Sequence, residues 1–71
     1  MMIKLWGDEE YEMEAPDDVR VEDIEDELLR EEGRVAHLYF RKRKLPRLYR
    51  LRDLGEEVFL ELRYGERREF E

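Results

Sequence analysis

The chain of 71 residues contains no cysteine, and it also contains no serine, threonine, asparagine or glutamine. Without cysteine there are no disulfides, thiolate metal ligands or thiol nucleophiles. Without serine and threonine the only hydroxyl groups are those of tyrosine, and there is no acceptor for N-glycosylation or for Ser/Thr phosphorylation. The sequence therefore predicts a protein that is not an enzyme and that uses no cofactor and no metal.

Long apolar runs are also missing. The chain contains no stretch of about 18 apolar residues, the length needed to cross a membrane. It also contains no basic segment followed by an apolar one, as a secretory signal would have. A chain this short buries only about 60% of its unfolded surface, which suits one domain with a modest core. We expect a single small cytoplasmic domain.

Charged residues fill much of the remaining sequence, at 49% of the chain. Loss of side-chain amides together with enrichment in charge is typical of hyperthermophile proteins, because ion-pair networks contribute more to stability at high temperature. A sequence designed from a restricted set of residues would have the same composition. Both origins stay open at this point.

The charges are segregated along the chain. Residues 7–32 hold fourteen acids and only two arginines, whereas residues 34–52 hold eight basic residues and no acid. The net charge is −7. Such segregation can serve a charged partner, or it can serve pairing inside the domain.

The first half of the chain predicts a β-hairpin and then a helix. Residues 2–6 and 11–15 alternate between apolar and polar side chains on either side of a glycine-containing turn. From residue 21 to 32, the apolar residues Val21, Ile24 and Leu28 follow the helical period, and Gly33 is a natural stop. Asp18 is the expected N-cap, because Arg20 is not a small polar residue.

The second half predicts further strands. Residues 35–41 and 58–64 are rich in β-forming residues, and residues 47–51 fit either a short fourth strand or an irregular turn. In the last strand Val58, Leu60, Leu62 and Tyr64 are expected to face inward. The order ββαβ(β)β indicates an α+β fold in which a mixed sheet packs on one helix.

This pattern resembles the ubiquitin-like β-grasp superfamily. The resemblance covers residues 2 to 64: the hairpin, the helix stripe ending at Gly33, and a closing segment from Leu51 to Arg63 (LRDLGEEVFLELR) that is similar to the closing segment of that superfamily. It implies a ubiquitin-like β-grasp domain over residues 1–65 and a charged tail over residues 66–71. Conjugated members end in Gly-Gly, but Gly65 is followed by a glutamate and the chain has no di-glycine. The resemblance therefore implies a non-conjugated interaction domain or a small accessory subunit.

Two groups of residues are candidates for binding a partner. Trp6, Tyr39 and Phe59 are expected on the outer face of the sheet, where ubiquitin-like proteins usually bind partners, although Phe70 could instead cover Trp6. The second group is the run of basic side chains between residues 41 and 47, made of Arg41, Lys42, Arg43, Lys44 and Arg47. These could contact a protein partner, contact the phosphates of a nucleic acid, or pair with the acidic helix.

Other charged residues carry no sign of catalysis. His37 is the only histidine, and the chain offers no Ser, Thr or Cys for it to activate, so we expect it to be an ordinary strand residue. The acids of the helix have no calcium-loop spacing and are expected to be solvated or paired.

These observations together predict a non-catalytic protein-interaction module or small accessory subunit. Two alternatives remain: a nucleic-acid-binding accessory domain that uses the basic residues of 34–52, and a designed protein with no biological role.

Overall fold

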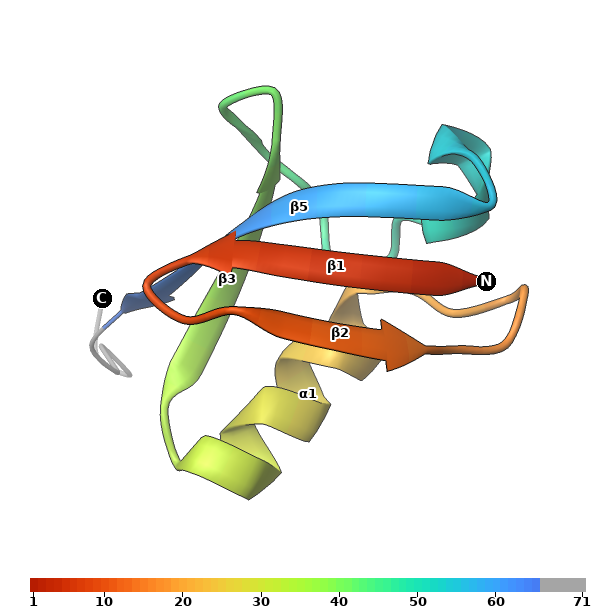
Figure 1. Cartoon of the computed structure of the whole chain (residues 1–71). Helices are drawn as coiled ribbons and strands as arrows, with labels where there is room; N and C mark the ends of the chain where they lie inside the picture. Colours follow the sequence, from red (N-terminus) through yellow and green to blue (C-terminus); the bar gives the residue numbers. More distant parts are fainter. Residues whose placement is uncertain (66–71) are drawn as a thin grey trace.

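The computed structural model describes residues 1–65 of the chain. The charged tail expected at residues 66–71 lies outside the described residues. The elements shown in Figure 1 are β1 (Met2–Gly7), β2 (Tyr11–Glu14), α1 (Val21–Glu32), β3 (Val35–Phe40), β4 (Arg43–Lys44), the 3₁₀-helix η1 (Leu51–Leu54) and β5 (Glu57–Gly65).

The strands form one mixed sheet in the order β2-β1-β5-β3-β4. The two ends of the chain supply its centre, because β1 and β5 pair in parallel while the other neighbours are antiparallel. Helix α1 lies across one face of the sheet (Figure 1) and leaves the opposite face uncovered by any other element of residues 1–65. This is a β-grasp arrangement, and it confirms the predicted α+β fold class.

The core lies between α1 and the sheet. Alternation along β5 buries Val58, Leu60 and Leu62, as predicted, and the predicted helix stripe is buried against them. Burying each such side chain stabilises the fold by about 1.5–3 kcal/mol. The complete set of buried apolar residues is Ile3, Leu5, Val19, Val21, Ile24, Leu28, Ala36, Leu38, Leu45, Leu51, Val58, Leu60 and Leu62.

The end of β1 requires glycine. Gly7 has a φ of 127°, and a Cβ at this position would collide with the backbone carbonyl oxygen of Leu62 on β5. Glycine has no Cβ, so it tolerates both the positive φ and the close approach of β5 at this point. A larger residue at position 7 would force these strands apart.

The start of α1 differs from the prediction. The N-cap is Arg20, not Asp18. Asp23 explains this, because its side-chain Oδ2 accepts the backbone N–H of Arg20 at 2.9 Å while its own N–H donates to the Arg20 carbonyl at 3.0 Å. The capping carboxylate belongs to Asp23, the third residue of the helix, so a small polar side chain at the N-cap position is not needed.

The third strand is shorter than predicted. It ends at Phe40, and Arg41 and Lys42 turn the chain with φ values of 52° and 69°. Two positive φ values in succession match the twist that a tight hairpin needs. Strand β4 follows at once and pairs with Tyr39 and Phe40. We call residues Arg41–Lys44 the basic hairpin.

The segment 47–51 is not a strand. It forms a turn that makes one isolated bridge, between Arg50 and Arg20, and leads into η1 at Leu51. Its carbonyl groups cover the start of α1: those of Tyr49 and Arg47 accept the N–H groups of the first two helical residues at 3.0 and 2.8 Å. These N–H groups have no partner within a helix, so the turn completes the helix end.

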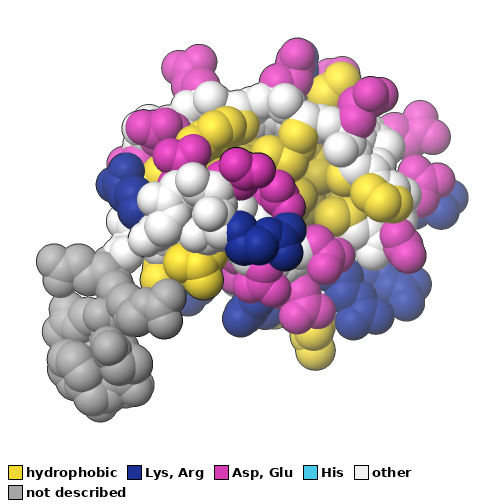
Figure 2. Space-filling view, turned by 90° about the horizontal axis from the view of Figure 1, so that it is seen from below, with side chains coloured by type: hydrophobic (Ala, Val, Ile, Leu, Met, Phe, Trp, Pro, Cys, Tyr) yellow, Lys and Arg dark blue, Asp and Glu magenta, His cyan; other side chains and the backbone are white. Residues whose placement is uncertain are grey.

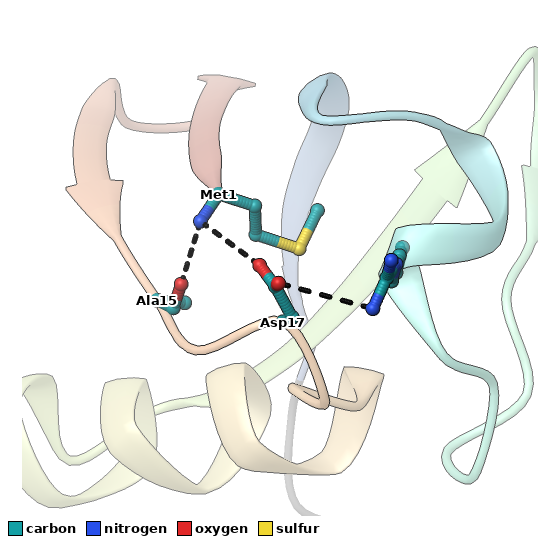
Figure 3. A network of polar contacts seen from close by, with 4 residues as sticks. Met1, Ala15 and Asp17 are labelled. Atoms are coloured by element: carbon teal, nitrogen blue, oxygen red, sulfur yellow. Dashed lines mark hydrogen bonds and ion pairs between the residues drawn. The ribbon is translucent and has the colours of Figure 1, made fainter.

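The N-terminus is anchored to the connection between β2 and α1 (Figure 3). The ammonium of Met1 donates to the Ala15 carbonyl at 2.8 Å and lies 3.8 Å from the carboxylate of Asp17. The other oxygen of Asp17 lies 3.8 Å from Nη1 of Arg52. The network ties the first residue to both the β2–α1 connection and η1.

Within residues 1–65 no helix is long and apolar enough to cross a membrane.

Candidate functional site

The candidate site is the face of the sheet opposite α1. Alternation directs every second side chain of the strands to this face, and strand register sets which of them are neighbours. Trp6 on β1 lies beside Glu61 on β5, Glu61 lies beside Tyr39 on β3, and Tyr39 lies beside Lys44 on β4. One row of side chains therefore crosses four strands.

A second row brings a lysine onto an aromatic ring. Lys4 on β1 is opposite Phe59 on β5, and its Nζ lies 5.4 Å from the centre of the Phe59 ring and 3.5 Å from Glu12 Oε2. Trp6 is two residues further along β1, so it is a diagonal neighbour of Phe59, and both line one shallow hollow. Trp6 is 53% exposed and Phe59 is 52% exposed, which leaves half of each ring system open to solvent.

A shallow depression lies on the other side of Trp6. Tyr39, Lys42, His37 and Arg63 line it together with Trp6. Tyr64 is a third aromatic residue in its lining, and the depression connects the aromatic part of the face to the basic hairpin.

The charges in this depression are partly paired. Arg63 Nε donates to Glu61 Oε2 at 2.6 Å, and this hydrogen bond raises the pKa of the Arg63 guanidinium. Partial burial, helped by the charge of Lys44, lowers the pKa of the His37 imidazole, so His37 is predominantly neutral at pH 7. A neutral histidine and a paired carboxylate leave Lys42 as the prominent positive charge at the rim.

The basic hairpin is exposed along its whole length. None of its four side chains forms an ion pair with another residue of 1–65. The guanidinium of Arg41 lies 5.2 Å from the centre of the Phe40 ring. The hairpin thus adds net positive charge at one end of the aromatic face.

Arg47 does not join this face. It turns toward α1, where its Nε lies 3.3 Å from Glu25 Oε1 and its Nη2 donates to Asp26 Oδ1 at 2.7 Å. Burial raises the pKa of the Glu25 carboxyl, and Arg47 opposes this shift by stabilising the charged form. Glu25 Oε2 is buried without a hydrogen-bond partner among the described residues. Of the three alternatives for the basic side chains, Arg47 therefore follows the third: it pairs with the acidic helix.

The other predicted site residues lie close together. Trp6, Tyr39 and Phe59 share the open face, and the basic hairpin adjoins it. Cover of Trp6 by Phe70 falls outside the described residues. Sequence reasoning does not assign Lys4, Glu61 and Arg63 to the site, because only the register of β1 against β5 places them among the aromatics.

No group of three or more His, Asp or Glu side chains within residues 1–65 is placed to hold a metal ion. No family model and no curated protein matches the chain.

Proposed function

We propose that this protein is a non-catalytic interaction module of the ubiquitin-like β-grasp type that binds a protein partner on the open face of its sheet. The observation that carries the proposal is the half-exposed pair Trp6 and Phe59. Large aromatic side chains exposed next to each other and rimmed by charge are typical of protein interfaces, where Trp and other aromatics contribute most of the binding energy.

The charges around the aromatics indicate what the partner carries. Lys4 lies opposite Phe59 and two residues before Trp6 on β1, and the basic hairpin lies beyond Tyr39. A complementary surface would place an apolar patch on the aromatics and carboxylates opposite these bases. We therefore propose a folded partner with an acidic rim around an apolar patch.

The test is capture of partners by a crosslinking pull-down from the source cells with the double variant Tyr39→Ala/Phe59→Glu. Capture of the proteins bound by the unmodified chain should fall by at least tenfold, because the variant removes one aromatic ring and places a charge on the patch. Circular dichroism should show that the fold is retained, since neither side chain belongs to the buried core.

Leu48→Glu is the matched control. Leu48 is 63% exposed, so it is a comparable apolar surface residue, but it lies in the 47–50 turn rather than on the strands of the face. Capture should survive this substitution. If the double variant still captures the same proteins, or if Leu48→Glu loses them equally, the open face is not the binding site.

One observation favours a second candidate function, binding of single-stranded nucleic acid. The four bases of the basic hairpin have no ion-pair partner within residues 1–65, and Tyr39 beside them could stack on a base. Affinity for an oligonucleotide would fall steeply with salt and would be lost in Lys42→Glu/Arg43→Glu. Absence of binding at low salt rejects this candidate and leaves the first one intact.

The composition also supports an origin at high temperature, and we include this in the proposal. A melting midpoint above about 90 °C is the expected result.

A further inference from the structure

The open face of the sheet has an acidic edge of its own along β2. Glu10 and Glu12 line the same shallow hollow as Trp6 and Phe59. Both glutamates are exposed, and Oε2 of Glu12 lies 3.5 Å from Nζ of Lys4. Glu10 forms no ion pair with any residue of 1–65. The chain itself therefore presents what the proposed partner requires, an apolar patch bordered by carboxylates.

The opposite edge of the same face is basic. Lys44 lies beside Tyr39 in the ladder of β3 and β4. Lys42 lines the depression that lies on the other side of Trp6 from the acidic hollow. Neither lysine forms an ion pair within residues 1–65. Acidic, aromatic and basic side chains thus follow one another across the face from β2 to β4.

The strand order makes this arrangement complementary to itself. In the order β2-β1-β5-β3-β4 the middle strand is β5, with β1 and β3 on either side of it. When two copies stack face to face, a half-turn about an axis along β5 brings β1 of each copy opposite β3 of the other, and β2 opposite β4. Such a two-fold contact is isologous, so each favourable pair of side chains occurs twice.

The half-turn brings complementary side chains together. Trp6 on β1 meets Tyr39 on β3 of the second copy, because the two lie in one row of the sheet on either side of Glu61. The two Phe59 side chains meet near the axis, and the glutamates of the β2 edge meet the lysines of the β4 edge. The aromatic contacts remove the half-exposed rings from water, and the opposite charges fix the orientation of the two copies.

The charges of the middle strand set a limit on the affinity. Glu61 and Arg63 lie on β5, so each approaches its own copy near the axis. Their hydrogen bond of 2.6 Å joins them into a pair without net charge, so this part of the contact is compensated within each copy. Glu57, at the exposed start of β5, approaches its own copy without a cation. We therefore expect a weak, reversible dimer.

The other apolar surface of the molecule is less suited to a second copy. It is the groove between β2 and α1, whose lining includes Met13, Ile24 and Leu28. Figure 2 shows this side, where carboxylates flank the hydrophobic side chains. Two copies that met there about a two-fold axis would bring like charges together, whereas the open face brings opposite charges together.

We infer that the partner of the open face is a second copy of this chain, bound face to face about a two-fold axis along β5. The inference rests on the proposed function, because it uses the same aromatic face and names what binds there.

Sedimentation equilibrium of the full chain tests the inference between about 10 µM and 1 mM, in about 150 mM salt so that long-range repulsion is screened. The expected result is a reversible equilibrium of monomer and dimer without larger species, because an isologous contact closes after two copies. Tyr39→Ala/Phe59→Glu should be monomeric over the same range. When the ¹⁵N-labelled chain is diluted, the amide signals that move should belong to the strands and not to α1.

Charge reversal at the two edges provides matched variants. Glu10→Lys/Glu12→Lys and Lys42→Glu/Lys44→Glu should each weaken dimerisation at least about tenfold, because every reversed charge acts twice. An equimolar mixture of these two variants should regain the affinity of the unmodified chain within about threefold, since each edge then meets an opposite charge again.

Glu31→Lys/Glu32→Lys is the control for the acidic edge. It changes the net charge as much as Glu10→Lys/Glu12→Lys does, at exposed positions of α1 that do not line the aromatic hollow. Because it lowers the net repulsion between copies, it should not weaken dimerisation.

Three results would overturn the inference. These are a monomer at 1 mM, a dimer that persists in Tyr39→Ala/Phe59→Glu, and a mixture of the two reversed variants that stays monomeric. The proposed function is decided separately by the pull-down. If the chain is monomeric but captures other proteins that the double variant loses, the aromatic face binds a different partner. If capture survives in the double variant, the proposed function itself is rejected.

Discussion

Two parts of the basic segment 34–52 differ in what their side chains contact, although both are basic. In the first part the basic hairpin is exposed and forms no ion pair within residues 1–65. In the second part Arg47 is held by Glu25 and Asp26, and Arg52 approaches Asp17 in the network that anchors the N-terminus (Figure 3). The difference is one of position, because the turn at 47–50 runs against the acidic helix and the hairpin projects from the far edge of the sheet.

This comparison shows that a run of like charges in a sequence can be divided between side chains that pair inside the fold and side chains that stay exposed. Arg47 compensates a buried carboxylate, so its contribution is to stability. The four hairpin side chains form no ion pair within residues 1–65, although the charge of Lys44 also lowers the pKa of Glu25, after the larger effect of Arg47. The following predictions test this division.

The largest effect is expected for Arg47→Ala. The substitution leaves Glu25 buried without its cation and should lower the free energy of unfolding by about 2 kcal/mol, less than a fully buried pair would lose because Arg47 is itself half exposed. Urea denaturation at pH 7 measures this. Arg43→Ala is the control from the hairpin and should stay within about 0.5 kcal/mol of the unmodified chain. Equal losses of stability in the two variants would remove the distinction between the hairpin and Arg47.

A smaller effect is expected when the Met1 ammonium is blocked. Acetylation removes its charge next to Asp17 and disturbs its hydrogen bond to the Ala15 carbonyl, at a cost of about 1 kcal/mol. Thermal denaturation of the acetylated and free forms provides the comparison. Arg52→Ala should cost less than about 0.5 kcal/mol, because this ion pair is long and exposed. A larger loss in Arg52→Ala than on acetylation would show that the arginine, and not the ammonium, maintains the network.

The smallest effect is expected in how the free energy of unfolding depends on pH. The pKa of Glu25 is raised in the folded state by burial, so the folded protein binds this proton more tightly than the unfolded chain does. Stability therefore falls as pH rises from the ordinary glutamate pKa through the raised value. Glu25→Gln removes this dependence, so lowering the pH from 7 toward 5 should stabilise the unmodified chain more than the variant.

Glu31→Gln, an exposed glutamate of the same helix, is the control for that experiment. Denaturant midpoints at several pH values give the slopes. Parallel curves for the unmodified chain and Glu25→Gln would mean that burial of Glu25 has no influence on stability.

Much of the fold could be predicted because local patterns agree with the tertiary structure. Alternation gave the inward face of β5, and the spacing of Val21, Ile24 and Leu28 gave the helix with its observed ends. The turn at Arg41 and Lys42 could not be predicted, since neither residue type favours positive φ. The N-cap was wrong because the capping group belongs to Asp23 and not to the cap residue.

The candidate site could be predicted only in part. Alternation was sufficient to place Trp6 and Phe59 on the outer face, but their proximity depends on the parallel register of β1 and β5, which the residues do not encode locally. Arg47 was grouped with the hairpin because the two are near in sequence. Its separation from the hairpin depends on the distance to Glu25, which only the three-dimensional arrangement determines.

The turn at Arg41 and Lys42 has a consequence for engineering the protein. Two residues with side chains in the left-handed region each cost about 1 kcal/mol or more, and Asn-Gly would adopt the same turn with less strain. Replacing Arg41 and Lys42 by Asn-Gly would raise the stability of the domain. It would also remove two positive charges from the hairpin and so weaken binding to the proposed partner. Stability and affinity for the proposed partner are thus opposed at this one turn. Selecting variants for thermal stability alone would tend to remove the positive charge that the proposed partner recognises.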